Sequence, residues 1–289
     1  MVTATQANLM DRYQQVIFPA AKPYYGDDPL VVSHAKDQYV YDNAGRQYLD
    51  FFGGVLTVSV GHCNDDVTAA TIEQLQKAQH TSTLFVNEIM VRVAEKVAQL
   101  TPGRLQMSYF TNSGSEANET AIMAARMYTD NSDIIALRHA YSGRTMTAMS
   151  MTAHGTWRLG NTFDGNIKHV RNPYVYRAPF DGMTPEQVVD LCIQDLEEVL
   201  ATCTNGKIAA FIAEPIQGVG GFIVPPTDYF QRVLPIIREA GGVFISDEVQ
   251  TGWGRTGGKW FGIEHWGVEP DMMTFAKGMA NGSPIGCTV

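Results

Sequence analysis

The sequence has few cysteines, no long apolar run and no excess of positive charge, and each absence argues against a class of protein. Four cysteines, Cys63, Cys192, Cys203 and Cys287, are scattered without the spacing of a zinc knuckle or a redox pair. We expect reduced thiols that pack in the interior. The seven histidines are dispersed, so no metal site is predicted. No stretch approaches the roughly 18 consecutive apolar residues of a membrane-spanning helix.

The charge balance and the N-terminus limit the partners. The chain has 30 acidic and 21 basic residues and a net charge of -9, whereas a nucleic-acid-binding protein needs a basic face. Its first residues lack a basic start followed by an apolar run, so no secretory signal is expected. Hydrophobic residues make up 45%, an ordinary globular fraction. These features predict a cytoplasmic protein with no nucleic-acid or membrane partner.

The chain changes character near residue 65. The earlier part is rich in loops and has short β-like runs, whereas the later part alternates helical patterns with short apolar runs. The β-like runs are Gln38–Tyr41 and Tyr48–Phe52, and the first helical patterns are Val67–Ala78 and Asn87–Leu100. The alternation is typical of an α/β sheet with helical crossovers. We therefore predict an N-terminal segment, residues 1–64, and an α/β domain, residues 65–289.

Four apolar runs of the second part each end on polar, reactive or glycine-rich residues. The runs and the residues after them are Gln106–Thr111 before Asn112–Ser115, Ile208–Ala213 before Glu214, Val243–Ser246 before Asp247, and Met272–Ala276 before Lys277. Because ligands bind at the carboxyl ends of strands in open α/β sheets, we expect these groups to meet in one crevice. Between two of the runs, Asp228–Ala240 is predicted to be a crossover helix that ends at Gly241.

Each group also has a plain structural explanation. Ser113 and Glu116 fit a capping box, although a glycine-containing turn at a helix N-terminus also suits a phosphate. Asp247 follows a very apolar strand, where it fits either a structural ion pair or a partner for a ligand cation. Lys277 is either a solvated lysine or an amine whose pKa is lowered by burial. Tyr141 is either a core aromatic or a ring that stacks on a planar ligand.

One glycine motif is rejected. Gly252–Gly257 matches the G-x-G-x-x-G pattern of dinucleotide-binding proteins. The residues after it, GKWFGIEHWG, have no helical periodicity, so no helix N-terminus is available to bind a pyrophosphate. A Walker A loop also fails, because Trp260 follows Gly258 and Lys259 where Ser or Thr is required.

In this order and context, five segments resemble a known family. They are YLDFFGGVLTVSVGH (Tyr48–His62), NSGSEANE (Asn112–Glu119), AEPIQG (Ala213–Gly218), SDEVQTGWGRTG (Ser246–Gly257) and TFAKGMANGSPIG (Thr274–Gly286). They are similar to the class III aminotransferases that depend on pyridoxal 5′-phosphate (PLP), most of all to the alanine–glyoxylate aminotransferase 2-like enzymes. The resemblance implies PLP-dependent transferase fold type I, with a mostly parallel central sheet flanked by helices. Residues 1–64 would then supply part of the small domain and a substrate-pocket loop.

The resemblance also implies roles for individual residues. Lys277 matches the lysine that binds PLP covalently and later moves a proton at the substrate α-carbon. Asp247 would pair with the pyridinium nitrogen, and Gln250 would bind the phenolic oxygen. Gly114 and Ser115 would hold the phosphate. The remaining assignments are Tyr141 and Val249 on the two faces of the ring, and Glu214, Val55 and Leu56 in the substrate pocket.

These roles imply a ping-pong transaminase that forms a homodimer. It would move an amino group from a small amino acid or ω-amino compound to pyruvate or glyoxylate. Three alternatives stay open at this point: an aminomutase, a decarboxylase, and a catalytically silent truncated fragment.

Two departures from the family pattern stand out. Relatives usually carry Tyr-His-Gly where this chain has Tyr141-Ser142-Gly143. The chain also stops at Val289, just as Ile285–Val289 begins to look like a strand, which would leave that strand unpaired. We therefore expect a C-terminally incomplete chain that lacks the C-terminal small domain. The absent part would carry a phosphate-binding Thr donated across the dimer, and often an Arg for the substrate carboxylate.

Overall fold

The computed structural model divides the chain into two compact units. It describes residues 4–21, 23–26, 28–160, 164–177 and 179–289. The smaller unit comprises Met1–Val55 and Val60–Gln79, and the larger unit comprises Leu56–Ser59 and His80–Val289. The predicted division after residue 64 therefore differs from this one, because the helix Asp65–Lys77 belongs to the smaller unit.

The smaller unit contains an antiparallel three-stranded meander. Its elements are α1 (Ala4–Val16), β1 (Val32–Lys36), β2 (Tyr39–Asp42), β3 (Gln47–Leu49), α2 (Gly53–Leu56, whose last residue belongs to the larger unit) and α3 (Asp65–Lys77). The two β-like runs predicted from the sequence correspond to β2 and β3, paired in the order β1-β2-β3. Gly45 closes the turn between them by donating its N–H to the Asp42 carbonyl, at 3.0 Å.

The four residues of α2 do not form an ordinary helix. Gly53, Gly54, Val55 and Leu56 all have φ between 58° and 64°, which is the left-handed region. Glycine adopts this conformation freely, but a β-branched residue such as Val55 is strained there. The segment is thus a tight left-handed turn within the predicted substrate-pocket loop.

The larger unit is built on a seven-stranded sheet. Its strands are β4 (Tyr109–Thr111), β5 (Ile134–Leu137), β6 (Ile167–Val170), β7 (Ala210–Ala213), β8 (Val243–Asp247), β9 (Met272–Phe275) and β10 (Gly286–Thr288). They are arranged in the order β4-β10-β9-β8-β7-β5-β6. The five strands from β9 to β6 are parallel, and β10 alone runs antiparallel to its neighbours. The predicted α/β class with a mostly parallel sheet is confirmed.

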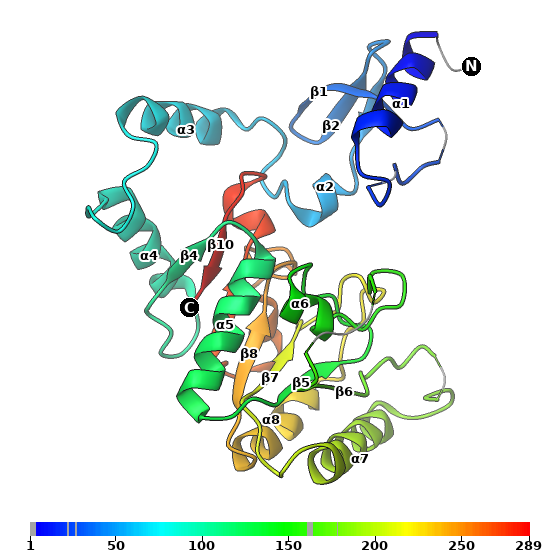
Figure 1. Cartoon of the computed structure of the whole chain (residues 1–289), viewed down its shortest axis with the longest axis vertical. Coiled ribbons are helices and arrows are strands. Elements are labelled where there is room, and N and C mark those ends of the chain that lie inside the picture. The colour runs from blue at the N-terminus through cyan, green and yellow to red at the C-terminus, as the bar shows by residue number, and fades with distance from the viewer. Residues whose placement is uncertain (1–3, 22, 27, 161–163, 178) are drawn as a thin grey trace. The chain divides into compact units, whose positions relative to one another are not determined.

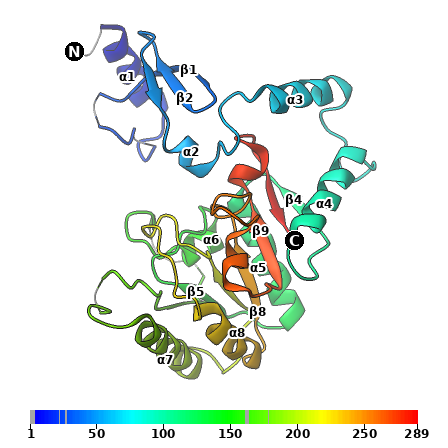
Figure 2. The ribbon, with the colours of Figure 1, turned by 180° about the vertical axis from the view of Figure 1, so that it is seen from behind.

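Helices cover both faces of this sheet (Figures 1 and 2). They are α4 (Glu88–Leu100), α5 (Gly114–Thr129), α6 (Met146–Met151), α7 (Pro185–Cys203) and α8 (Tyr229–Glu239), with short 3-10 turns η1 (Gly262–Trp266) and η2 (Lys277–Ala280). Because strand side chains alternate, Ile134 and Ala136 of β5 face the core formed with α5 and α6. Ile135 and Leu137 face the other core, formed with α7 and α8.

Local sequence signals explain where these helices begin and which face they bury. Thr184 and Gln187 form a reciprocal capping box at the start of α7. In α8, Phe230, Val233 and Ile237 are buried at helical spacing, so a single stripe packs against the sheet. The crossover helix predicted at Asp228–Ala240 is confirmed, as are the two helical patterns that became α3 and α4.

Two expectations need correction, and a third agrees with the structure. The strand expected at Ile285–Val289 is present as β10, but it is not left unpaired, because it pairs with both β4 and β9. Interior packing holds for Cys192 and Cys287, whereas Cys63 and Cys203 are exposed. After Gly252–Gly257 the chain forms only the short 3-10 turn η1, which agrees with rejecting a dinucleotide site.

Two kinds of feature, a membrane-spanning helix and a metal-binding cluster, are absent from the described part of the chain. None of its helices is long and apolar enough to cross a membrane. Among the same residues, no three His, Cys, Asp or Glu side chains gather closely enough to hold a metal ion.

Candidate active site

A cavity of about 170 Å³ lies at the carboxyl ends of the strands. The predicted site residues that line it are Gly114, Ser115, Tyr141, Glu214, Asp247, Val249, Gln250 and Lys277. The four strand-end groups therefore meet in one crevice, as expected from the sequence. Val55 and Leu56 are not among the residues that line it, and their role in a substrate pocket stays a prediction.

One wall of the cavity is the first turn of α5. Ser113 is the N-cap, and its hydroxyl oxygen accepts the Glu116 N–H at 3.3 Å. Glu116 in turn accepts the Asn112 N–H, so the capping residues are occupied by the cap itself. Gly114 and Ser115 follow in the first turn, where backbone N–H groups have no partner within the helix and the helix dipole is positive. This turn can bind an anion.

Close packing requires glycine on both sides of this turn. A Cβ added to Gly114 would lie 2.9 Å from Val249 Cγ2. Gly143 has φ 131°, and a Cβ there would lie 2.3 Å from the Ser115 hydroxyl oxygen. That hydroxyl also accepts the Arg144 N–H at 3.1 Å, which links the turn to the loop after β5.

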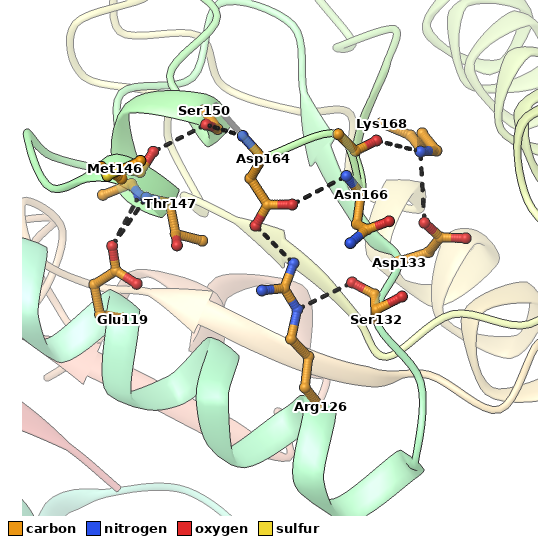
Figure 3. Close-up of polar contacts among 12 residues, drawn as sticks. Glu119, Arg126, Ser132, Asp133, Met146, Thr147, Ser150, Asp164, Asn166 and Lys168 are labelled. Carbon is orange, nitrogen blue, oxygen red and sulfur yellow. Dashed lines mark hydrogen bonds and ion pairs between the residues drawn. The ribbon is translucent and has the colours of Figure 1, made fainter. Parts of the chain in front are cut away.

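Polar contacts hold α5 to α6 and to the segment before β6 (Figure 3). Glu119 accepts the N–H groups of Thr147 at 3.0 Å and Ala148 at 3.4 Å, and so caps α6. About two turns further along α5, Arg126 pairs with Asp164 at 2.8 Å. The helix that carries the anion-binding turn is therefore anchored along its length.

Asp247 ends β8 and is only 3% exposed. Its Oδ2 accepts an N–H from Asn118 at 2.9 Å, and its Oδ1 accepts the Val249 N–H at 3.1 Å. Burial raises the pKa of this carboxyl, while these two hydrogen bonds and the charge of Lys277 oppose the rise. A buried carboxylate of this kind suits a cationic ligand group.

Glu214 follows β7 and is the second buried carboxyl of the cavity. Its two oxygens accept the N–H groups of Tyr141 at 3.2 Å and Gly218 at 3.0 Å. Burial raises the pKa of Glu214, and the nearby charge of Asp247 raises it further. The backbone hydrogen bonds and Lys277 act in the opposite direction.

Lys277 begins η2 directly after β9. Its φ of 29° lies in the left-handed region, a strained backbone of the kind found at functional sites. Burial lowers the pKa of its amine, and the charges of Glu214 and Asp247 partly offset this effect. Because a neutral amine is the nucleophilic form, the cavity favours reaction at Lys277.

Tyr141 and Gln250 complete the cavity. The half-buried Tyr141 ring meets Trp157 edge-on, with centroids 6.0 Å apart. The end of the Gln250 side chain lies against Gly218: a Cβ on Gly218 would fall 1.9 Å from Gln250 Oε1, so a larger residue there would displace this amide.

Four further lining residues were not predicted: Asn118, Ser142, Gly143 and Ala276. Ser142 and Gly143 directly follow Tyr141, and Ala276 precedes Lys277, so their neighbours signalled them. Asn118 was hidden inside a helical pattern. An asparagine in a helix interior, four residues after a glycine-containing turn, is the one signal that could have revealed it.

Comparison with known proteins agrees with this arrangement. The family model described as aminotransferase class-III matches residues 22–289. The chain belongs to the class-III aminotransferase family. It is 41% identical over 261 residues to alanine–glyoxylate aminotransferase 2 homolog 2 of Arabidopsis thaliana, covering 90% of this chain and 53% of that protein. It is 36% identical over 298 residues to human alanine–glyoxylate aminotransferase 2, covering 97% of this chain and 58% of that protein.

Solved aminotransferase and transaminase structures share the fold. An (S)-enantioselective ω-transaminase from Thermomicrobium roseum superposes with a TM-score of 0.90 at 35% identity, over 98% of this chain and 65% of that one. A Bacillus anthracis aminotransferase gives a TM-score of 0.88 at 31% identity, over 100% of this chain and 65% of that one. The predicted PLP-dependent transferase fold is thereby confirmed. The chain spans a little over half the length of the curated relatives above.

The cavity fits the cofactor that a class-III aminotransferase implies. The start of α5, where glycines leave no room for a side chain, suits the phosphate of PLP. The buried Asp247 suits its ring nitrogen, and Lys277 offers an amine to its aldehyde. The roles of the individual residues stay predictions, but the residues of this chain that are predicted to hold PLP line one cavity.

Proposed function

We propose that this chain is the PLP-binding part of a transaminase. It would move an amino group from a small amino acid or ω-amino compound to pyruvate or glyoxylate by a ping-pong mechanism. One observation carries the proposal: a partly buried lysine, a buried carboxylate and a helix N-terminus line the same cavity at the carboxyl ends of the strands. The named relatives, alanine–glyoxylate aminotransferases and an ω-transaminase, support the choice of substrates.

The chain's own residues would divide the work. When bound, PLP supplies an aldehyde that condenses with amines and a ring that accepts electrons. Lys277, whose pKa is lowered by burial, would attack as the neutral amine and later carry a proton to or from the substrate α-carbon. Asp247 would keep the ring nitrogen protonated by its negative charge. Gly114 and Ser115 would hold the phosphate, and Gln250 the phenolic oxygen. A homodimer and a cytoplasmic location stay predictions from the sequence.

Absorbance tests the proposal directly. Purified protein saturated with PLP is expected to show a yellow band that Lys277→Ala abolishes. Lys259→Ala, which removes an exposed lysine, should leave the band unchanged. Adding L-alanine should bleach the band and release pyruvate, and glyoxylate should restore it.

Other outcomes would identify other functions. Release of carbon dioxide instead of pyruvate would indicate a decarboxylase. Isomerisation of the amine without a second oxo acid would indicate an aminomutase. A folded protein with no lysine-dependent band would contradict the proposal.

A further inference from the structure

Asn118 lies inside α5, one turn after the anion-binding start of the helix, and lines the cavity. It is 1% exposed, so each of its polar atoms needs a partner. Its Nδ2 donates to Asp247 Oδ2 at 2.9 Å and to the Ser142 carbonyl oxygen at 2.9 Å. Its Oδ1 accepts the Thr274 hydroxyl at 2.7 Å. One amide therefore connects α5 with the loop after β5, the end of β8 and the strand β9.

These contacts determine which way the amide faces. The Nδ2 group has two hydrogens, and both are used by acceptors, the Asp247 carboxylate and the Ser142 carbonyl. Rotating the amide by half a turn would place Oδ1 against those two acceptors and Nδ2 against the Thr274 hydroxyl. The two acceptors thus keep an N–H of Asn118 directed at Asp247, and the buried Thr274 hydroxyl completes the arrangement by donating to Oδ1.

The Asp247 carboxylate is consequently held at both oxygens. Asn118 binds Oδ2 from the helix side, and the Val249 N–H binds Oδ1 from the following turn. Each oxygen keeps a second lone pair, so the group can still accept a hydrogen bond from a ligand cation.

We propose that Asn118 is a positioning residue that holds Asp247 in its charged form and in one orientation, ready to pair with a cationic ring nitrogen. The inference rests on the proposed function, because only a ligand with such a nitrogen makes use of the carboxylate. The Asp247 carboxylate is buried, and burial disfavours its charged form. Among the described residues, Asn118, the Val249 N–H and Lys277 favour the charged form.

The pKa of Asp247 is the quantity that separates this role from a merely structural one. It can be followed in the cofactor-free protein by 13C NMR of labelled aspartate carboxyl groups, with Asp247→Asn used for assignment. Asn118→Leu keeps a similar volume but removes the hydrogen bond to the carboxylate. We expect this variant to raise the pKa of Asp247 by about 1 unit or more, the usual effect of one hydrogen bond to a charged group. Glu214 and Lys277 remain in place in both proteins.

A matched control exists in the same unit. Asn172 is also buried and donates Nδ2 to Gln217 at 2.8 Å, away from Asp247. Asn172→Leu should lower the melting temperature, as any lost buried amide does, but leave the titration of Asp247 unchanged. Thr274→Val provides a second variant. It removes the hydroxyl that donates to Asn118 Oδ1 but leaves the Asn118–Asp247 hydrogen bond possible, so we expect a smaller rise in the same pKa.

Cofactor binding gives the second measurement. We expect Asn118→Leu to weaken PLP binding about tenfold, measured by fluorescence titration, because a protonated Asp247 no longer attracts the ring nitrogen. Asn172→Leu should bind PLP as the wild type does.

The outcomes distinguish this inference from the proposed function. An unchanged pKa of Asp247 in Asn118→Leu, or an equal shift in Asn172→Leu, would overturn the role of Asn118 even if the wild type shows its lysine-dependent band. If Asn118→Leu does not fold, Asn118→Ala removes the same hydrogen bond, and an unchanged pKa of Asp247 in that variant has the same meaning. A wild type without the band overturns the proposed function and with it the pairing to a ring nitrogen, whatever the NMR shows.

Discussion

At the scale of single residues, two carboxyl groups of one cavity have different surroundings. Both are buried, which raises the pKa of each. Asp247 receives a side-chain hydrogen bond from Asn118 and a backbone one from Val249. Glu214 has two backbone hydrogen bonds but also faces the charge of Asp247. Such a difference separates two acids into an ionised group and a group that holds its proton, with Asp247 the ionised one.

This difference predicts how stability depends on pH. The pKa of Glu214 is raised in the folded protein. Its contribution to the stability of the fold is therefore fully present below its pKa in the unfolded state, about 4.3, and is lost as pH rises through its pKa in the folded state. Glu214→Gln cannot ionise and avoids this loss. We therefore compare the melting temperature of Glu214→Gln with that of wild type, both free of cofactor. The variant's melting temperature minus that of wild type should be about 3 °C larger at about pH 8 than at about pH 5.

Melting curves over that pH range provide the measurement. The result that matters is how the difference in melting temperature between Glu214→Gln and wild type changes with pH. The exposed Glu197→Gln should track the wild type throughout. A constant offset between Glu214→Gln and wild type would mean that Glu214 does not hold a proton more tightly in the folded state.

The sequence reveals single residues unevenly. Lys277, Asp247 and Glu214 are visible because each is a charged residue directly after an apolar run, where burial needs an explanation. Asn118 is not visible in this way, because its partners Asp247 and Thr274 lie 129 and 156 residues further along the chain. Only the sheet order brings those positions to one helix.

At the scale of elements, Glu248 anchors the turn that directly follows β8. It is fully buried. Its Oε1 accepts the Ser246 hydroxyl at 3.3 Å and the Ile263 N–H at 2.8 Å. Its Oε2 accepts the Thr251 hydroxyl and the Gly262 N–H, the latter at 2.9 Å. This single carboxylate joins the turn that follows Asp247 to the start of η1. It therefore holds η1 in place, an element that the sequence pattern left undefined.

Replacing Glu248 by Gln should destabilise the larger unit. Each carboxylate oxygen accepts one backbone N–H, so the amide nitrogen of Gln must face a backbone donor in either orientation. We expect a loss of about 2 kcal/mol or more in the free energy of unfolding. Urea unfolding measures it, with Glu239→Gln at the exposed end of α8 as the control, expected within about 0.5 kcal/mol of wild type. Equal stabilities for the two variants would show that the hydrogen bonds of Glu248 are replaceable.

Element prediction worked where local patterns dominate. The stripe of α8 and the apolar runs of β7, β8 and β9 follow from periodicity, and these elements appear within a few residues of the expected bounds. The left-handed turn Gly53–Leu56 could not be predicted in this way. Gly-Gly permits such a turn, but nothing in the local sequence requires Val55 to adopt a conformation that its branched side chain disfavours.

At the scale of the whole molecule, the sheet is held together by a strand that runs against the others. β10 comes last in the chain yet lies between β4 and β9. Cys287 pairs with Phe110 on one side and Phe275 on the other, and Thr288 donates its hydroxyl to the Ala117 carbonyl of α5 at 2.8 Å. Periodicity predicted a strand here, but its central place depends on long-range pairing that no local pattern encodes.

This central place predicts that a charge in β10 destabilises the entire larger unit. Cys287 is 0% exposed, and burial raises the pKa of its thiol to about 11, so it packs as a neutral core residue. Cys287→Asp would bury a carboxyl among apolar neighbours. It would also weaken the pairing of β10 with both β4 and β9. We expect a loss of about 3 kcal/mol or more in the free energy of unfolding, measured by urea with circular dichroism. Cys203→Asp makes the same change at an exposed position and should cost at most about 1 kcal/mol. If β10 were a dispensable edge, Cys287→Asp would unfold at the same urea concentration as Cys203→Asp.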